Sequence, residues 1–86
     1  MDINQLIEIV KRKINHEIVC ENIKVEDKTF LHKNHKSQEK NKFHLKLIIK
    51  SKQLNTENKI NSTKKIYKIL DDEFNKYIHS IQILIN

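Results

Sequence analysis

The last third of the chain changes from a helical to a strand-like spacing of apolar residues, and this change restricts the fold more than any other feature. Apolar residues first recur at every fourth position, which places them on one helix face: Ile66, Leu70, Phe74 and Ile78. They then alternate along a strand, with Ile81, Ile83 and Ile85 on one side and Ser80, Gln82 and Leu84 on the other. His79 lies at the changeover, where an imidazole on rigid backbone near a surface edge favours a functional site over a core position.

The first half of the chain has the patterns of one helix and two strands. Asp2 can cap a first helix that extends to about Ile18. Its buried stripe is predicted to contain Ile3, Leu6, Ile7, Val10 and Ile14. Alternating apolar and polar residues predict strands over residues 23–27 and 43–50, and in the second of these Phe43, Leu45, Leu47 and Ile49 point to one side.

Two polar connections separate these elements. Residues 28–42 are rich in lysine and have no period, so they predict a long loop. Residues 52–61 predict a second connection with a short helical turn around Leu54. Ser62 or Thr63 can then cap the long helix that leads into the final strand.

The predicted order of elements is helix, strand, strand, helix, strand. Because three strands cannot bury both of their faces unaided, we expect an α+β fold in which two helices cover one face of a mixed sheet. The 86 residues show no internal repeat and predict a single domain over residues 1–86. The pattern alone does not fix the order of strands in the sheet.

The composition excludes several classes of protein. Glycine and proline are absent, which rules out glycine-rich phosphate-binding loops and the Gly-x-x-Gly loop of nucleic-acid-binding KH domains. No apolar run approaches the roughly 20 residues of a membrane-spanning helix, and Asp2 is an acid where a signal peptide carries positive charge. We therefore expect a soluble cytoplasmic protein. Cys20 is the only cysteine, which fits a reducing compartment and a half-buried apolar role.

The net charge of +6 is unevenly distributed. Residues 28–68 contain twelve lysines and only two acids, Glu39 and Glu57, whereas acids outnumber bases in the two flanking segments. A basic middle segment can attract nucleic acid or an acidic protein. The alternative is a solvated surface in a lysine-rich chain.

Histidines are the residues best suited to carry chemistry, and they are His16, His32, His35, His44 and His79. The pair His32-x-x-His35 has metal-compatible spacing but lacks the further ligands of a closed zinc site. His79 and one loop histidine can instead contribute to a metal whose other ligands come from elsewhere. Catalysis has little support, because Cys20 has no adjacent base and the acidic run at residues 71–73 is expected on a solvated helix face.

Several segments resemble the BolA family, in the same order and spacing. Residues 43–51 resemble the family's His-Phe-Lys-Val-Val-Ile-Val-Ser strand, and residues 66–74 resemble its Val-Tyr-x-x-Leu-x-x-Glu-Leu helix. Ile78-His79-Ser80-Ile81 is similar to the signature Ile-His-Ala-Leu. Residues 23–29 and the histidines of the loop also resemble family segments, so the resemblance covers nearly the whole chain.

The resemblance implies an αββαβ fold like a type II KH domain without the Gly-x-x-Gly loop. It implies a non-enzymatic adaptor, in iron–sulfur cluster assembly, trafficking or iron sensing, that pairs with a monothiol glutaredoxin carrying a Cys-Gly-Phe-Ser motif. A two-iron two-sulfur (2Fe–2S) cluster would be shared with the glutaredoxin cysteine and glutathione, with His79 and either His32 or His35 as ligands from this chain. The isolated chain would hold no cofactor and would be a monomer or a weak homodimer. His44, expected to face solvent, is the poorer candidate.

One departure from the family bears on an alternative function. Residues 62–64 read Ser-Thr-Lys where many members have Arg-His-Arg, which weakens any role in DNA binding. Lys64, Lys65 and Lys68 can still contact phosphates without sequence preference. A nucleic-acid-binding transcriptional regulator that uses the basic segment 28–68 is therefore the alternative hypothesis.

Overall fold

A computed structural model describes residues 1–29 and 42–86. The predicted loop therefore falls mostly outside the described residues, and so do His32 and His35. The elements in chain order are α1 (Ile3–Glu17), β1 (Asn22–Asp27), β2 (Phe43–Lys50), α2 (Lys52–Asn55), α3 (Lys59–Ile69), α4 (Asp71–Lys76) and β3 (Ile78–Ile85).

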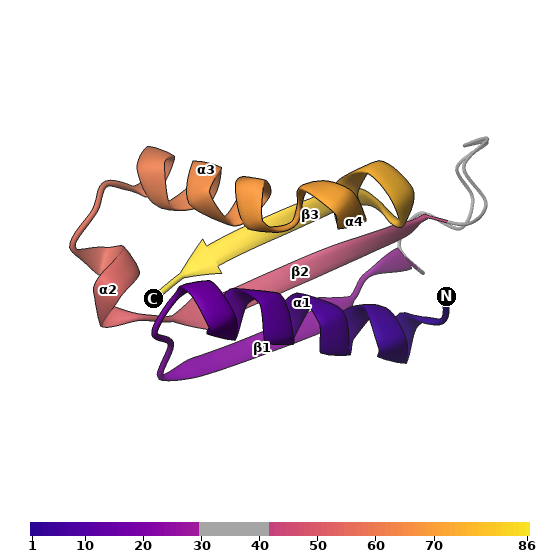
Figure 1. Ribbon diagram of the computed structural model, residues 1–86, viewed down its shortest axis with the longest axis horizontal. Helices are drawn as coiled ribbons and strands as arrows, with labels where there is room; N and C mark the ends of the chain where they lie inside the picture. Colours follow the sequence, from indigo (N-terminus) through magenta and orange to yellow (C-terminus); the bar gives the residue numbers. More distant parts are fainter. Residues whose placement is uncertain (30–41) are drawn as a thin grey trace.

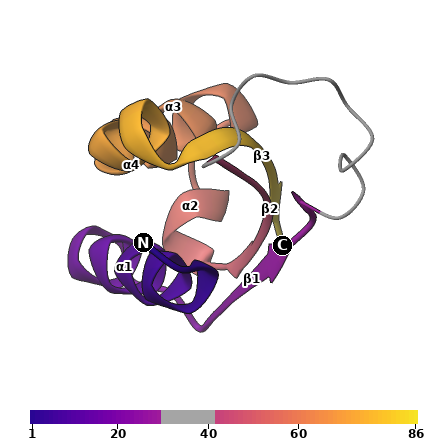
Figure 2. The ribbon, with the colours of Figure 1, turned by 90° about the vertical axis from the view of Figure 1, so that its right-hand side faces the viewer.

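The three strands form one mixed sheet in the order β1-β2-β3. β1 runs antiparallel to β2, and β2 runs parallel to β3. Parallel neighbours cannot be joined by a tight turn, so the chain crosses over through α2, α3 and α4. All four helices lie on one face of the sheet (Figures 1 and 2), which confirms the expected α+β, type II KH-like architecture.

Helix α1 forms as the sequence predicts. The Asp2 carboxylate accepts a hydrogen bond of 2.9 Å from the Gln5 amide, and the Asp2 amide donates to the Gln5 side chain at 3.1 Å. This reciprocal pair satisfies amides that the first helical turn leaves unpaired. The buried face of the helix contains Leu6, Val10 and Ile14, and it continues to Ile18 at the C-cap, whereas Ile3 and Ile7, predicted in the same stripe, are only half-buried.

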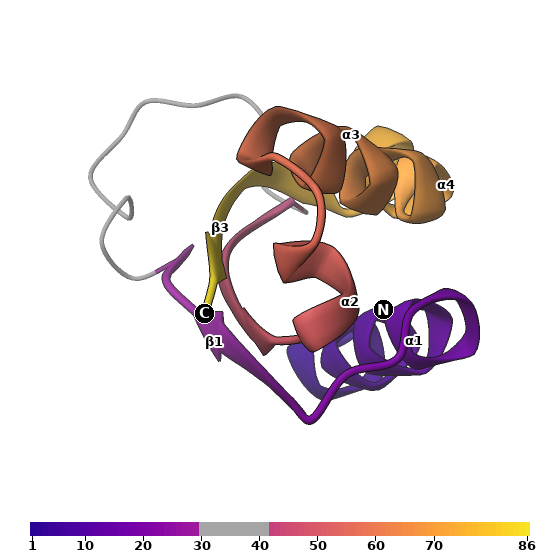
Figure 3. The same cartoon turned by 90° about the vertical axis from the view of Figure 1, so that its left-hand side faces the viewer.

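The predicted start of the long helix is wrong, because α3 begins four residues before Thr63. Its N-cap is Asn58, whose side-chain oxygen accepts a hydrogen bond of 2.8 Å from the Asn61 amide. Ser62 instead lies buried inside the helix, where its hydroxyl donates to the Leu54 carbonyl at 2.9 Å. That bond fixes α3 to α2, the helical turn expected around Leu54, which lies between α1 and α3 at one end of the molecule (Figure 3).

The long helix is also divided into two. It breaks at Leu70, whose backbone angles of φ −99° and ψ 19° lie outside the helical range, and α4 follows directly. The four-residue apolar period survives the break, since Ile66 and Leu70 are buried and Phe74 is half-buried. The core lies between the helices and the inner face of the sheet, where Leu45, Leu47 and Ile49 of β2 are buried.

The acidic run at residues 71–73 is only partly solvated, which corrects the prediction. Asp71 and Asp72 are exposed, but Glu73 is buried at 5% exposure. Its two carboxylate oxygens accept hydrogen bonds of 2.8 and 2.9 Å from the ammonium group of Lys13. This ion pair joins α1 to α4 across the helical layer.

Among the described residues, no helix is both long enough and apolar enough to cross a lipid bilayer.

We expect Lys13→Met to lower the free energy of unfolding by about 2 kcal/mol, because it leaves the buried Glu73 carboxylate without its cation. Urea denaturation measures this loss. Lys11→Met is the matched control, since no partner for Lys11 is seen among the described residues, and it should cost less than about 0.5 kcal/mol. Equal losses in the two variants would show that the ion pair is not stabilising.

Candidate metal-binding site

An irregularity in the sheet determines the position of His79. Phe43 is paired with Ile78, but the next residue of β2, His44, is paired with Ser80. His79 is therefore an extra residue in β3, as in a β-bulge. A bulge changes the side to which the following residues point, so Ile78 and Ile81 both face the helices while His79 and Ser80 are both exposed.

His44 lies directly beside this bulge. Its ring centroid is 4.8 Å from that of His79, with the two ring planes at 62°. Its Nδ1 is 2.6 Å from the Ser80 hydroxyl oxygen, a hydrogen bond that fixes the ring. In the tautomer in which Nδ1 donates, Nε2 keeps the lone pair that a metal requires. His44 lies on the open face of the sheet, as expected, but the residue is half-buried and its ring lies against a second imidazole.

The surroundings of the two imidazoles are basic. A hollow of about 440 Å³ on the open face of the sheet is lined by Lys28, His44, Leu45, Lys46, Ser80, Ile81 and Gln82. Lys28 is paired with Glu26 at 3.6 Å, so the Lys46 ammonium is the main positive charge at the hollow, and it favours an anionic group there. The site offers imidazole nitrogen donors beside lysine side chains.

His16, the third histidine among the described residues, and Cys20 are not part of this site. His16 is exposed on α1, where its Nδ1 is 3.2 Å from a Glu17 carboxylate oxygen. Within residues 1–29 and 42–86, no group of three or more histidine, cysteine or acidic side chains is arranged to hold a metal ion. A metal at His79 and His44 would therefore need further ligands from outside the described residues, as the shared site expected from the sequence requires.

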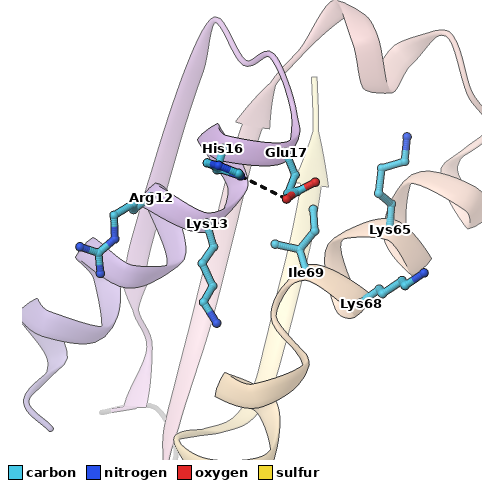
Figure 4. A pocket seen from close by; sticks show the side chains of 7 residues that line it. All are labelled: Arg12, Lys13, His16, Glu17, Lys65, Lys68 and Ile69. Atoms are coloured by element: carbon cyan, nitrogen blue, oxygen red, sulfur yellow. Dashed lines mark hydrogen bonds and ion pairs between the residues drawn. The ribbon is translucent and has the colours of Figure 1, made fainter.

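The lysines predicted to contact phosphates lie in the helical layer, away from the open face of the sheet. Lys65 and Lys68 line a cleft of about 650 Å³ between α1 and α3, whereas Lys64 is exposed outside it. The cleft also contains Arg12, Lys13, His16, Glu17 and Ile69 (Figure 4). Lys13 is paired with Glu73 at 2.8 Å and Lys65 with Glu57 at 3.0 Å, so part of this charge is neutralised.

The mixed three-stranded sheet, the helices on one face and the histidine at the start of β3 define a BolA-type α+β domain. A family of proteins described as BolA-like matches residues 14–86, and the chain belongs to this family. A search of curated proteins finds no match.

Solved structures show the same fold. The chain is similar to the BolA domain of SufE1 from Arabidopsis thaliana, with a TM-score of 0.77 and 21% identity over 100% of this chain and 93% of that one. BolA1 from Arabidopsis thaliana gives a TM-score of 0.75 and 19% identity, covering 91% of this chain and 86% of that one. A bol-like protein from Babesia bovis gives 0.69 and 14% identity, with coverage of 91% and 79%.

We expect the Cys20 thiol to be alkylated slowly at neutral pH. Burial raises the pKa of this thiol above its ordinary value, and the nearby Glu21 carboxylate raises it further. Because only the thiolate reacts, iodoacetamide should modify the folded protein several-fold more slowly than the urea-unfolded chain, with the rate rising above pH 8. Mass spectrometry measures the rate. Equal rates in both states would contradict the raised pKa.

Proposed function

We propose that this protein is a non-enzymatic cytoplasmic adaptor that pairs with a monothiol glutaredoxin and contributes histidine ligands to a shared 2Fe–2S cluster. Membership of the BolA-like family is the starting point. The observation that carries the proposal is the bulge at the start of β3, which exposes an imidazole that regular alternation would turn toward the core. A strand irregularity beside a ligand-capable side chain is typical of functional sites.

The donor set suits a shared cluster. This chain would supply His79 and a second imidazole, for which His32, His35 and His44 are the candidates, while the glutaredoxin cysteine and glutathione would supply the thiolates. Imidazole is a weaker, neutral donor than thiolate, so a cluster held in this way has a raised reduction potential and is more readily passed on. Cys20 does not fit as a ligand, because it precedes the end of β1 that pairs with Lys50, whereas His79 lies at the opposite end of the eight-residue strand β2.

We expect His79→Ala to remove most of the visible absorption and circular dichroism of the mixed cluster. The purified protein, a monothiol glutaredoxin, iron, sulfide and glutathione would be combined anaerobically. His16→Ala is the matched control, since His16 is an exposed histidine on α1, and its spectrum should equal that of the parent protein. His32→Ala, His35→Ala and His44→Ala, compared in the same way, identify the second ligand.

The outcome that would contradict the proposal is an unchanged spectrum in the His79→Ala complex. Size-exclusion chromatography of the same mixture separates two kinds of failure. If the His79→Ala variant forms a complex with an altered cluster, His79 is supported as a ligand. If neither the parent protein nor the variant forms a complex with the glutaredoxin, the partnership itself is overturned.

The basic cleft between α1 and α3 supports a second function, binding of nucleic acid by a transcriptional regulator. Arg12 and Lys68 have no charged partner among the described residues and line the same cleft as Lys65. Ammonium and guanidinium groups along two helices can contact successive phosphates without reading bases. The replacement of the family's Arg-His-Arg run by residues 62–64 makes this the weaker candidate.

For this second function, we expect the triple variant Lys64→Gln, Lys65→Gln, Lys68→Gln to weaken binding to duplex DNA and to reduce its salt dependence. Each lost phosphate contact should lower the slope of log K against log salt by about 0.9. The charge-matched control replaces Lys24, Lys46 and Lys50, which lie on the sheet, with glutamine. Fluorescence anisotropy measures both, and equal weakening by the two triple variants would show that only net charge matters.

A further inference from the structure

β3 is an edge strand without the usual protection against pairing. It contains eight residues, Ile78–Ile85, and none of them is charged, although a third of the chain (33%) is Asp, Glu, Lys or Arg. Proteins usually protect such edges with lysine, proline, bulges or short length. The bulge at His79 is confined to the start of the strand, and the pairing with β2 is regular from Ser80 to Ile85.

The opposite edge of the sheet differs in these respects. β1 is six residues long and contains three charged side chains, those of Lys24, Glu26 and Asp27. Lys24 and Glu26 form an ion pair of 3.4 Å on this strand. Charged groups of this kind oppose the addition of another strand. As far as residues 1–29 and 42–86 show, the two edges of the sheet are therefore unequal, and β3 is the edge open to pairing.

The backbone groups of β3 alternate between the two sides of the strand. The Asn86 amide donates to the Ile49 carbonyl at 2.7 Å, so even-numbered residues direct their hydrogen-bonding groups toward β2. The amides and carbonyls of Ile81, Ile83 and Ile85 then point away from β2. Within residues 1–29 and 42–86, no strand lies beyond β3 to accept them.

The surface around this edge is partly apolar. Leu84 is 38% exposed on the open face. Between α3 and the strand, a hollow of about 180 Å³ is lined by Lys59, Thr63 and residues 83–86. An added strand therefore has both unpaired backbone groups and apolar side chains to contact.

We propose that β3 pairs antiparallel with β3 of a second copy about a twofold axis, which joins the two sheets into one. With the axis at Gln82, the centre of the overlap, Ile81 lies opposite Ile83 of the second copy. Both residues direct their free amides and carbonyls outward, so they form hydrogen-bonded pairs. Gln82 then lies opposite Gln82 of the second copy in a pair without mutual hydrogen bonds.

A second copy fits this edge better than an unrelated chain for two reasons. The seam contains no charge, so two molecules with a net charge of +6 can meet here without like charges facing each other along the strand. A twofold interface also uses the same alternation on both sides, which places isoleucine against isoleucine. Because a single strand pair is a small interface, we expect a dissociation constant in the micromolar range for this dimer.

Disulfide trapping tests the pairing and its register. In a Cys20→Ser background, Gln82→Cys should form a reducible dimer in mild oxidant, because facing residues in such a pair have Cα atoms about 4.5 Å apart, within the range for a disulfide. Lys24→Cys is the matched control on the other edge, and we expect it to cross-link at least tenfold more slowly. Equal rates, or no dimer from Gln82→Cys, would overturn the proposal.

A second measurement does not depend on cysteine chemistry. Gln82→Lys and Gln82→Glu should each weaken the self-association seen by sedimentation, because like charges then face each other, and an equimolar mixture should restore it. Thermal unfolding of each variant verifies that the fold is intact. Failure of the mixture to associate, or a parent protein that stays monomeric at several hundred micromolar, would refute pairing with a second copy. The isolated protein suffices, so the result is independent of any glutaredoxin partner.

Discussion

The parallel pairing of β2 with β3 is the constraint on which the rest of the structure depends. Since parallel neighbours need a crossover, the segment between them must traverse the sheet, and it does so as α2, α3 and α4. The same pairing contains the one-residue irregularity that exposes His79 and places it against His44. The helical layer and the candidate site thus have a common origin in one strand pair.

Polar contacts then fix the helices over that sheet. The Ser62 hydroxyl holds α3 to α2, and the Lys13–Glu73 ion pair holds α1 to α4. In each contact a buried polar group is hydrogen-bonded, and moving the helices would leave that group without its partner, so these contacts restrict how the helices can pack. The side of the sheet away from the helices keeps polar and ligand-capable residues, among them His44, Lys46 and Ser80, and this division separates the core from the proposed chemistry.

Periodicity predicted the elements well, because burial on one face imposes a regular spacing on helices and strands alike. Periodicity did not predict where α3 begins, because several side chains in this segment can cap a helix. Asn58, Ser62 and Thr63 are all capable caps, and only the contact of Ser62 with the Leu54 carbonyl shows that it lies inside the helix. The acidic run also looked solvated, since the partner of Glu73 is 60 residues away along the chain.

The candidate site was predicted in part. The change of apolar spacing and the resemblance to BolA proteins both predicted a role for His79, but the proximity of His44 depends on the register of β2 against β3, which the sequence does not state directly. One signal was present in the spacing: Ile78 and Ile81 are three residues apart, whereas Ile81, Ile83 and Ile85 are two apart, as an extra residue in the strand requires. His32 and His35 lie outside the described residues and stay predictions.

Pulsed electron paramagnetic resonance of the reduced mixed cluster tests the central claim most directly. The histidines of this chain alone would be labelled with ¹⁵N before the complex with glutaredoxin is assembled. Coordination by His79 and a second imidazole predicts two strongly coupled ¹⁵N nuclei from this chain, of which one disappears when residue 79 is alanine. A cluster without any coupled nitrogen from this chain, or one whose nitrogen couplings are all unchanged by that replacement, would contradict the account.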